Sequence, residues 1–532
     1  MQNSRRGVAT SGVFKGVDRT MSIASIAMVI AFVLFSILQP DLANNIYTGI
    51  KQFIEQQLGW YYILVVNIVL FTAVGITLSP FGRLKLGRDD ERPEFSNFTW
   101  FAMLFSAAVG TGLLFWSIAE PLSHLQGNPF IANAGIEPNT LAAGQMALTL
   151  TIFHWGLHGW AIYILVGTIL AYFAYRRGLP MTIRSAFYPL LGERIHGPIG
   201  HLIDLLAIFA TLFGTATTLG LGVSQMNAGL NSLFGLEISS TNQVLLVLGV
   251  TVAATVSAVS GLKKGIRLLS EWNIHLSLVL FAFFFIAGPT VFLLSLFTTS
   301  LGDYTSKIFS MGFWTNPNPE SQWQGWWTLF YWGWWLSWGP YVGMFIARIS
   351  RGRTIRQVLL GGMLAAVLGA ACWVVIFGGT AMHLQLLQGV DLVSVANESV
   401  TTVLFQTIAA LDVSWATTFM IALATVMIIT WFVTSADSGT LVICTILAKG
   451  DEHPPQLYRV VWGLGLGATA GVLLIAGGLE ALQTAAIAAA LPFSMALLVM
   501  CYCMIKALRE ERLDLSIADR LRAYPSTHPK ES

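Results

Sequence analysis

Long apolar segments separated by short loops make up most of this chain, and they constrain its fold more than any other feature. Hydrophobic residues account for 55% of the 532 positions and charged residues for 11%, whereas soluble domains contain roughly 25% charged residues. So few charges cannot cover the surface of a water-soluble protein of this size. The composition also excludes a disordered chain and a nucleic-acid binder. We therefore predict an all-α membrane protein whose surface mostly faces lipid.

Twelve of the apolar segments are long enough to cross the roughly 30 Å hydrocarbon core of a bilayer. They cover residues 21–40, 60–78, 98–119, 141–173, 199–229, 241–260, 269–298, 324–347, 356–380, 413–446, 458–477 and 480–506. With a cytoplasmic N-terminus, every one of the 29 basic residues except Lys51 and Lys307 lies on the cytoplasmic side. This asymmetry follows the positive-inside rule and predicts a multi-pass topology with both termini cytoplasmic.

Two of the segments contain residues that interrupt a helix at mid-membrane. The third contains Gly110 and Gly112, and the eighth contains Gly339-Pro340. Because the two segments are five spans apart, helices 3–7 and 8–12 are candidates for an inverted repeat, in which paired interrupted helices point to a transporter binding site. Close helix packing at the glycines and a simple kink at the proline are the alternative interpretation.

Aromatic residues gather in the eighth and fourth segments. Seven of the 18 tryptophans lie between residues 323 and 338. Trp334, Trp338 and Tyr341 share a helix face, as do Trp160 and Tyr163. Trp155 would lie off that second face on a regular helix, so it joins the set only if the helix is distorted, which Gly156 and Gly159 permit.

These aromatic stretches contain no Asp or Glu, and this points to one class of ligand. Several π faces without a countercharge suit a quaternary ammonium or sulfonium group, because such a cation donates no strong hydrogen bond but is attracted by ring quadrupoles. Ordinary helix packing is the alternative. His154 and His158 are interpreted as packing or hydrogen-bonding residues rather than proton carriers.

Hydroxyl groups recur where a small hard cation could bind. Thr211 and Thr215 stack one helical turn apart, and Thr434 and Ser435 lie in the tenth segment. Such oxygens, together with carbonyls of an unwound helix, suit Na⁺. The alternative is that each hydroxyl bonds the carbonyl four residues before it in its own helix.

Four ionisable residues lie in or near the segments, namely Glu120, Asp204, Glu271 and Asp437. Each is near a predicted membrane boundary, so a capping or gating ion pair is as reasonable as proton transfer. The sequence offers no metal-ligand spacing and no nucleophile–base pair, which argues against a membrane enzyme.

These motifs together resemble the betaine/choline/carnitine transporter family over essentially the whole membrane region. The most specific matches are Trp334-Trp335-Leu336-Ser337-Trp338 and the run from Gly343 to Arg353. Supporting matches are residues 154–163, 211–222 and 434–438, and Glu120-Pro121.

The resemblance implies the fold of the neurotransmitter–sodium symporters and a homotrimer. Its layout would be an N-tail at 1–20, two leading helices at 21–96, one five-helix repeat at 97–300, an amphipathic periplasmic helix within 301–316, the inverted repeat at 317–506 and a C-tail at 507–532.

The resemblance also implies the site residues. The substrate set is Trp155, Trp160, Tyr163, Trp334, Trp335 and Trp338, with Ala108, Gly110 and Gly112 of the interrupted third helix beside them. One sodium site would use the backbones of Ser106, Val109 and Trp431 together with Thr434 and Ser435, and the other would use Thr211, Thr215 and Tyr341. Ala108 adds a methyl group where the family often has glycine. Gly112 stands where the proton-coupled choline carriers have Asp, which favours sodium.

The sequence therefore predicts a secondary active transporter of the bacterial inner membrane. It would import a zwitterionic betaine-type solute, glycine betaine or dimethylsulfoniopropionate, by alternating access coupled to Na⁺, with no other cofactor. A proton-coupled choline transporter and a carnitine-type exchanger remain open as alternatives within the family, and a channel or membrane-embedded sensor remains open outside it.

Overall fold

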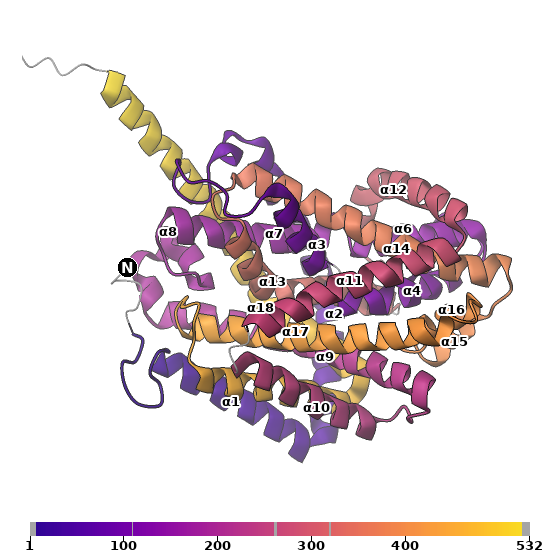
Figure 1. Cartoon of the computed structure of the whole chain (residues 1–532). Helices are drawn as coiled ribbons and strands as arrows, with labels where there is room; N and C mark the ends of the chain where they lie inside the picture. The colour runs from indigo at the N-terminus through magenta and orange to yellow at the C-terminus, as the bar shows by residue number, and fades with distance from the viewer. Residues whose placement is uncertain (1–6, 109, 260–262, 319–320, 524–532) are drawn as a thin grey trace, which may run out of the picture.

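A computed structural model describes residues 7–108, 110–259, 263–318 and 321–523 (Figure 1). Within these ranges the backbone alone is described at residues 105–108, 111, 258, 263–268, 270 and 512–523. Val109 therefore lies outside the described residues, and so do the side chains of Ser106 and Ala108. All other residues of the predicted site are described.

The first half of the chain is a series of helices joined by short connections. Their bounds are α1 Arg19–Leu38, α2 Pro40–Leu78, α3 Asn97–Ala108, α4 Thr111–Gln126, α5 Pro129–Asn133, α6 Leu141–His154, α7 Leu157–Ala171, α8 Tyr188–Leu191, α9 Pro198–Phe234, α10 Ser240–Val259, α11 Lys263–Ala287 and α12 Thr290–Gly312. Short 3₁₀ or π turns cover Pro80–Arg83, Tyr172–Arg176, Ile183–Phe187 and Gly192–His196.

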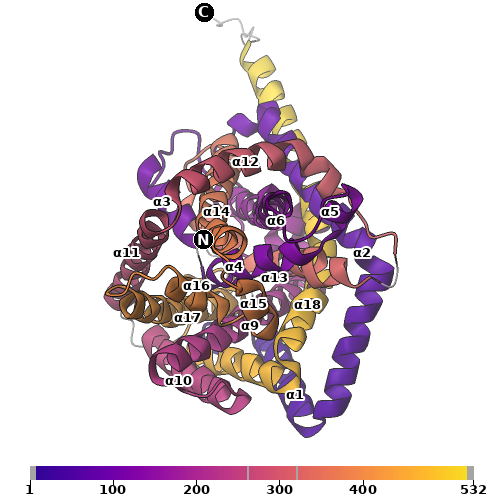
Figure 2. The same ribbon diagram turned by 90° about the vertical axis from the view of Figure 1, so that its right-hand side faces the viewer.

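The second half begins with a π-helical turn, η6, at Gly325–Leu329. The helices that follow are α13 Phe330–Ile349, α14 Gly362–Leu387, α15 Leu392–Glu398, α16 Val403–Ala410, α17 Thr417–Leu447 and α18 Gln456–Ala523, with a second π turn, η7, at Gln357–Gly361 before α14. The last turns of α18 project away from the bundle in both views (Figures 1 and 2).

Several helices are long and apolar enough to cross a membrane, which makes this a multi-pass membrane protein. Among the described residues eight helices meet this criterion, or nine if the bent pair α11–α12 is one span. Every predicted segment coincides with helix. The third, fourth and seventh are each divided between two helices, α3 and α4, α6 and α7, and α11 and α12, and the last two lie together in α18. The twelve-span layout and the inverted repeat therefore remain predictions.

The boundary between α11 and α12 lies inside the predicted seventh segment rather than at its end. The chain bends by 107° between the two helices, at Gly288-Pro289, where proline lacks the N–H that would continue the helical hydrogen bonds. The predicted seventh segment, 269–298, crosses this bend, and the predicted amphipathic helix within 301–316 is only the later part of α12. Figure 2 shows α12 arching over one side of the bundle.

The predicted break in the eighth segment is wrong, because α13 continues through Gly339 and Pro340. Proline removes one backbone hydrogen bond from a helix, yet α13 packs against α7, α9 and α18, and neighbouring helices can hold such a helix together in a membrane. Figure 2 places α13 and α4 near the middle of the bundle. The only interrupted helix of the predicted pair is therefore the third, which stops at Ala108 and resumes at Thr111.

The break inside α18 lies where the sequence predicts the boundary between its last two segments. Gly477 and Gly478 leave the helical conformation, and Gly478 has φ 56° and ψ −132°. Only glycine adopts such a conformation at low cost. The two glycines thus separate the eleventh and twelfth predicted segments.

A buried ion pair fixes the connection that leads into α9. The guanidinium of Arg184 donates through Nε to Asp204 Oδ2 at 2.5 Å, and the backbone N–H of Arg184 donates to Oδ1 at 2.9 Å. Both side chains are buried, at 2% and 0% exposure. Of the two roles considered for Asp204, the ion pair rather than proton transfer agrees with this geometry.

We predict that Asp204→Ala destabilises the protein by about 3–5 kcal/mol, because it leaves a buried guanidinium without a counterion. The measurement is thermal unfolding of the purified protein in detergent. Asp90→Ala is the control, since Arg88 and Asp90 are 3.4 Å apart but 79% and 75% exposed, and such a pair contributes about 1 kcal/mol or less. Equal unfolding temperatures for the two variants would contradict the prediction.

Candidate functional site

A break between α6 and α7 shapes the first wall of the candidate site. Helix α6 ends at His154 and α7 begins at Leu157. Gly156 is required between them, since a Cβ there would lie 2.4 Å from the hydroxyl of Tyr304 and 2.6 Å from the carbonyl oxygen of Ile152. The Tyr304 hydroxyl instead accepts a hydrogen bond from the N–H of Leu157 at 2.8 Å. This break is the helix distortion that the sequence predicts if Trp155 is to join the aromatic set. It lets Trp155 contact the Trp335 ring, which Trp160 also contacts.

Helix α13 provides the second wall, and it approaches α7 very closely. A Cβ on Gly159 would lie 2.4 Å from Cε2 of Trp335, and one on Gly343 would lie 2.4 Å from a methyl group of Val166. Glycines at these two positions let the tryptophan ring and the two helix backbones approach each other. The sequence thus places the rings of α13 directly against those of α7.

Five of the six predicted aromatic residues meet in one group, which we call the ring cluster: Trp155, Trp160, Tyr163, Trp334 and Trp335. The ring centroid of Trp335 lies 5.8 Å from that of Trp155, 5.4 Å from that of Trp160 and 4.6 Å from that of Tyr163. Trp334 joins through Trp155 at 6.0 Å. All five side chains are at least nine-tenths buried.

The sixth predicted residue, Trp338, has a different neighbour. Its ring contacts Tyr341 with centroids 5.1 Å apart. A Cβ added to Gly214 of α9 would lie 2.8 Å from Cδ1 of Trp338, so the Trp338 ring packs directly against α9. Trp338 therefore lies further along α13, between the ring cluster and the hydroxyl-bearing part of α9.

Hydrogen bonds from the protein fix three of the indoles. Nε1 of Trp334 donates to the hydroxyl of Thr218 at 3.0 Å, and Nε1 of Trp335 donates to the carbonyl of His154 at 3.0 Å. Nε1 of Trp155 donates to Glu120 Oε2 at 3.2 Å. These bonds set the ring planes and leave the π faces for packing or for a ligand.

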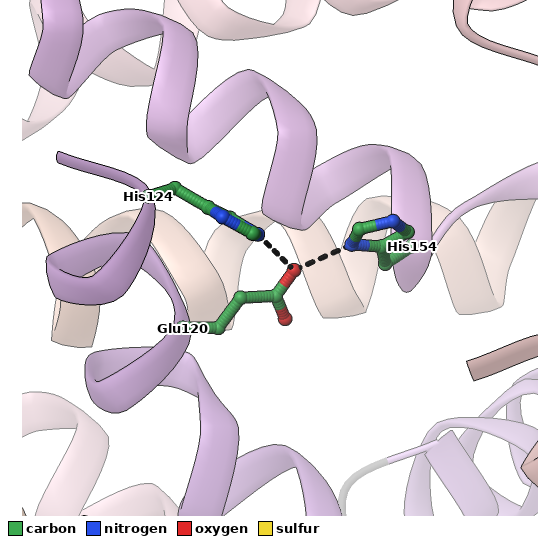
Figure 3. A group of neighbouring side chains, drawn as sticks. All are labelled: Glu120, His124 and His154. Atoms are coloured by element: carbon green, nitrogen blue, oxygen red, sulfur yellow. Dashed lines mark hydrogen bonds and ion pairs between the residues drawn. The ribbon is translucent and has the colours of Figure 1, made fainter. Parts of the chain in front are cut away.

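The carboxylate of Glu120 was not expected at this place. Figure 3 shows it between His124 of its own helix α4 and His154 of α6. Oε1 accepts from His154 Nδ1 at 2.6 Å and from His124 Nε2 at 3.2 Å, and Oε2 accepts from Trp155 and from the Tyr331 hydroxyl at 2.5 Å. The sequence-based argument that the aromatic set has no countercharge nearby is therefore wrong, because a carboxylate touches one of its rings.

This group of Glu120, His124 and His154 has the residue types of a metal site, and its three ligand atoms lie within 4.8 Å of one another. The distances favour hydrogen bonds instead. Two ligands held about 2.0 Å from a tetrahedral Zn²⁺ lie roughly 3.3 Å apart, whereas Glu120 Oε1 and His154 Nδ1 are 2.6 Å apart. His154 Nε2 also has a partner, the hydroxyl of Thr328 at 3.0 Å. We interpret the group as a hydrogen-bond network.

The start of α4 adjoins the ring cluster through Gly112. A Cβ at this position would lie 2.4 Å from Cη2 of Trp334 and 3.3 Å from Cη2 of Trp155. Gly110 is the residue that precedes the helix, and its carbonyl accepts the first helical hydrogen bond, from Leu114. The N–H groups at the start of a helix have no helical partner and carry a partial positive charge, so an anionic group beside the rings would face favourable dipoles.

The hydroxyls predicted for one sodium site are buried without partners. Thr211 and Thr215 of α9 are fully buried, and neither Oγ1 has a hydrogen-bond partner among the described atoms. Buried hydroxyls are usually bonded. Tyr341, the third predicted ligand, interacts with Ser438 of α17, and Gly439 of α17 lies against Thr215. The structure thus brings α9, α13 and α17 together here.

One of the two hydroxyls predicted for the other sodium site, that of Thr434, is engaged within its own helix. Thr434 Oγ1 donates to the carbonyls of Trp431 at 3.0 Å and Thr430 at 3.2 Å, which is the alternative considered for hydroxyls in membrane helices. Asn273 also donates to Thr434 Oγ1, at 3.5 Å. Ser435 follows on the same helix, partly buried. Of the two backbones predicted to complete this site, that of Ser106 lies in α3, whereas Val109 lies outside the described residues.

Sequence reasoning named Glu120 as an ionisable residue and as part of a family match. It interpreted His154 as a packing or hydrogen-bonding residue, which agrees with its bonds to Glu120 and Thr328. It did not single out His124 or Tyr331. The one usable signal was the spacing of Glu120 and His124, which puts both on one face of α4. Tyr331 lies 211 positions from Glu120 in the sequence, so no local pattern could connect the two.

The comparisons with known proteins agree on one family. A family model described as "BCCT, betaine/carnitine/choline family transporter" matches residues 20–513. The chain is 42% identical over 502 residues to a probable glycine betaine transporter of Desulfitobacterium hafniense, covering 93% of this chain and 99% of the relative. It is 43% identical over 509 residues to the glycine betaine transporter OpuD of Bacillus subtilis, covering 95% and 98%. A glycine betaine transporter of Acinetobacter baylyi is 40% identical over 517 residues, with 97% and 77% covered.

We predict that Gly112→Ala disrupts the ring cluster, because the added methyl group would lie 2.4 Å from Trp334. Overpacking of this kind costs about 1–3 kcal/mol, and the displaced ring would weaken the bond to Thr218. Thermal unfolding and the intrinsic tryptophan emission spectrum measure the two effects.

The matched control is Gly249→Ala in α10, where a Cβ meets nothing within 4 Å. This substitution should leave the emission spectrum unchanged. A Gly112→Ala protein indistinguishable from the control would contradict the close contact between α4 and Trp334.

Proposed function

The chain belongs to the betaine/carnitine/choline transporter family, and from this premise we propose that it imports a betaine-type solute across a bacterial inner membrane by Na⁺-coupled symport. The substrate is a zwitterion with a quaternary ammonium or sulfonium head and a carboxylate, of which glycine betaine and dimethylsulfoniopropionate are the candidates. Transport proceeds by alternating access, in a twelve-span homotrimer with both termini in the cytoplasm.

The ring cluster is the observation that carries the proposal. A trimethylammonium group has no N–H, so it gains little from hydrogen-bond acceptors and is best held by π faces, each worth about 0.5–2 kcal/mol when desolvated. In this protein the N–H groups of Trp155, Trp334 and Trp335 are already bonded to the protein. A ligand can therefore use only the ring faces that neighbouring side chains leave uncovered. One face of Trp334 is already stacked on Phe330, with the ring centroids 5.3 Å apart.

The carboxylate end of the substrate has two candidate partners beside the cluster. One is the positive end of α4, whose second residue, Gly112, lies against Trp334 and Trp155. The other is Nε1 of Trp160, which is buried and has no partner among the described atoms. A buried N–H without a partner costs about 1–3 kcal/mol, which an anionic oxygen of the ligand would offset.

Sodium coupling is supported by the pair of buried hydroxyls on α9. Thr211 and Thr215 lie one turn apart, and both Oγ1 atoms lack protein partners among the described atoms. Oxygen ligands of this kind suit Na⁺. We propose Tyr341 as the third ligand of this site, and Trp431, Thr434 and Ser435 with Ser106 and Val109 as the second site.

We predict that the purified protein in proteoliposomes accumulates labelled glycine betaine only under an inward Na⁺ gradient. Competition by unlabelled dimethylsulfoniopropionate, choline, carnitine and ectoine would then rank the substrates. Equal accumulation in K⁺ medium with an imposed proton gradient would show proton coupling instead. Flux that follows the substrate gradient alone, whichever ion is present, would indicate a channel.

We predict that Thr215→Ala raises the Na⁺ concentration for half-maximal uptake by about tenfold, the effect of losing one ligand worth roughly 1.4 kcal/mol. The fold should tolerate the change, since this hydroxyl has no described protein partner to lose. Ser224→Ala is the control on the same helix, because Ser224 bonds the carbonyl of Gly220 in its own helix. An unchanged Na⁺ dependence in Thr215→Ala would remove Thr215 from the site.

A further inference from the structure

We propose that the buried carboxylate of Glu120 is the countercharge of the ring cluster and thereby a specificity-determining residue for the cationic head of the substrate. This inference rests on the proposed function, because it assumes that the cluster receives a cation. It adds a residue of α4 that never contacts the substrate in the proposed arrangement and acts through the Trp155 ring and through its own charge.

The hydrogen bonds around Glu120 suit the ionised form. Trp155 Nε1 can only donate, and His154, His124 and Tyr331 complete a set of four donors on two carboxylate oxygens. The Nε2 atom of His154 meets the hydroxyl of Thr328, which can donate to it and so allow a neutral imidazole protonated on Nδ1. A carboxylate with four donors is stable in the interior without a proton of its own.

The second histidine also fits its neutral form. Nδ1 of His124 is buried and has no partner among the described atoms. As the acceptor atom of a neutral ring it leaves only a lone pair unbonded, whereas a protonated ring would bury a charged N–H without an acceptor. With both histidines neutral, as these contacts allow, Glu120 keeps its negative charge, and among the described residues no Lys or Arg is paired with it.

An uncancelled charge at this place acts on the ring cluster in two ways. Hydrogen bonding of Trp155 N–H to a carboxylate moves electron density into the indole and makes its faces more negative. The charge itself attracts a cation beside the rings, and burial in the membrane interior leaves this attraction weakly screened. Both effects favour a cation over a neutral group of the same shape.

Glu120 also connects the walls of the site. It joins α4 to α6 through His154 and Trp155, and to α13 through Tyr331. The carbonyl of His154 in turn accepts the N–H of Trp335. Substitution of Glu120 can therefore alter ring positions as well as charge, and the experiment has to separate these two effects.

The test compares the affinities of glycine betaine and of 3,3-dimethylbutanoate, in which carbon replaces the ammonium nitrogen, so that shape and carboxylate are kept and the positive charge is lost. Binding to the full-length protein is measured by tryptophan fluorescence in detergent. The wild type should prefer glycine betaine by at least about tenfold. In Glu120→Gln this preference should fall by about tenfold or more, mainly through weaker binding of glycine betaine.

Two further variants serve as controls, and a third is a substitute for the test. Glu120→Asp keeps the charge and should keep most of the preference. Thr328→Val removes the hydrogen-bond partner of His154 Nε2 but leaves the charge of Glu120, so it should weaken the binding of both ligands by the same factor. If Glu120→Gln does not give a monodisperse protein, Trp155→Phe replaces it as the test: the phenyl ring cannot bond the carboxylate, and the preference should fall severalfold.

The outcomes separate this inference from the proposed function. A wild type that binds glycine betaine and 3,3-dimethylbutanoate equally would contradict the cation-binding function itself. A wild type with a clear preference that persists in Glu120→Gln, or a variant in which both affinities drop by the same factor, would leave Glu120 a structural residue and overturn the inference.

Discussion

The hydrogen bonds of one buried carboxylate connect most of the features that give this protein its candidate site. Glu120 holds His154, the last residue of α6, and Trp155 in the break that follows, and it reaches α13 through Tyr331. A polar group enclosed by apolar helices costs several kcal/mol unless it is bonded, so this carboxylate can exist only where four donors converge. The three helices that supply the donors are thereby fixed relative to one another, and the ring cluster is built on them.

Glycines complete the arrangement, because they have no side chain at the points where helices and rings come closest. At Gly112 and Gly159 a methyl group would overlap a tryptophan ring, and at Gly156 it would overlap the hydroxyl of Tyr304. Glycine is needed at Gly478 in α18 for a different reason, because the backbone there has a positive φ. In this bundle glycine therefore marks close approach more often than helix ends.

Much of the fold and part of the site could be predicted from the sequence, and the limits have physical causes. Segment length and apolarity located the helices, since a membrane leaves little choice of secondary structure. The interrupted third helix and the distortion at Gly156 followed from local sequence. Continuity of α13 through Pro340 did not, because neighbouring helices decide it. The Glu120 network was also missed, because its members at 120, 154 and 331 meet only in the folded chain.

The two sets of hydroxyls show how the interior separates structural groups from groups available to a ligand. Thr434 bonds carbonyls of its own helix, as does Thr217, which also bonds Leu482 of α18. Thr211 and Thr215, on the same helix as Thr217, have no such bonds among the described atoms. These three threonines of α9 have identical chemistry, as does Thr218, which bonds Gly214 and accepts from Trp334, so their surroundings alone distinguish them. The same argument applies to the indoles. The N–H groups of Trp155, Trp334 and Trp335 are bonded within the protein, so a cation can interact only with ring faces that their neighbours leave uncovered.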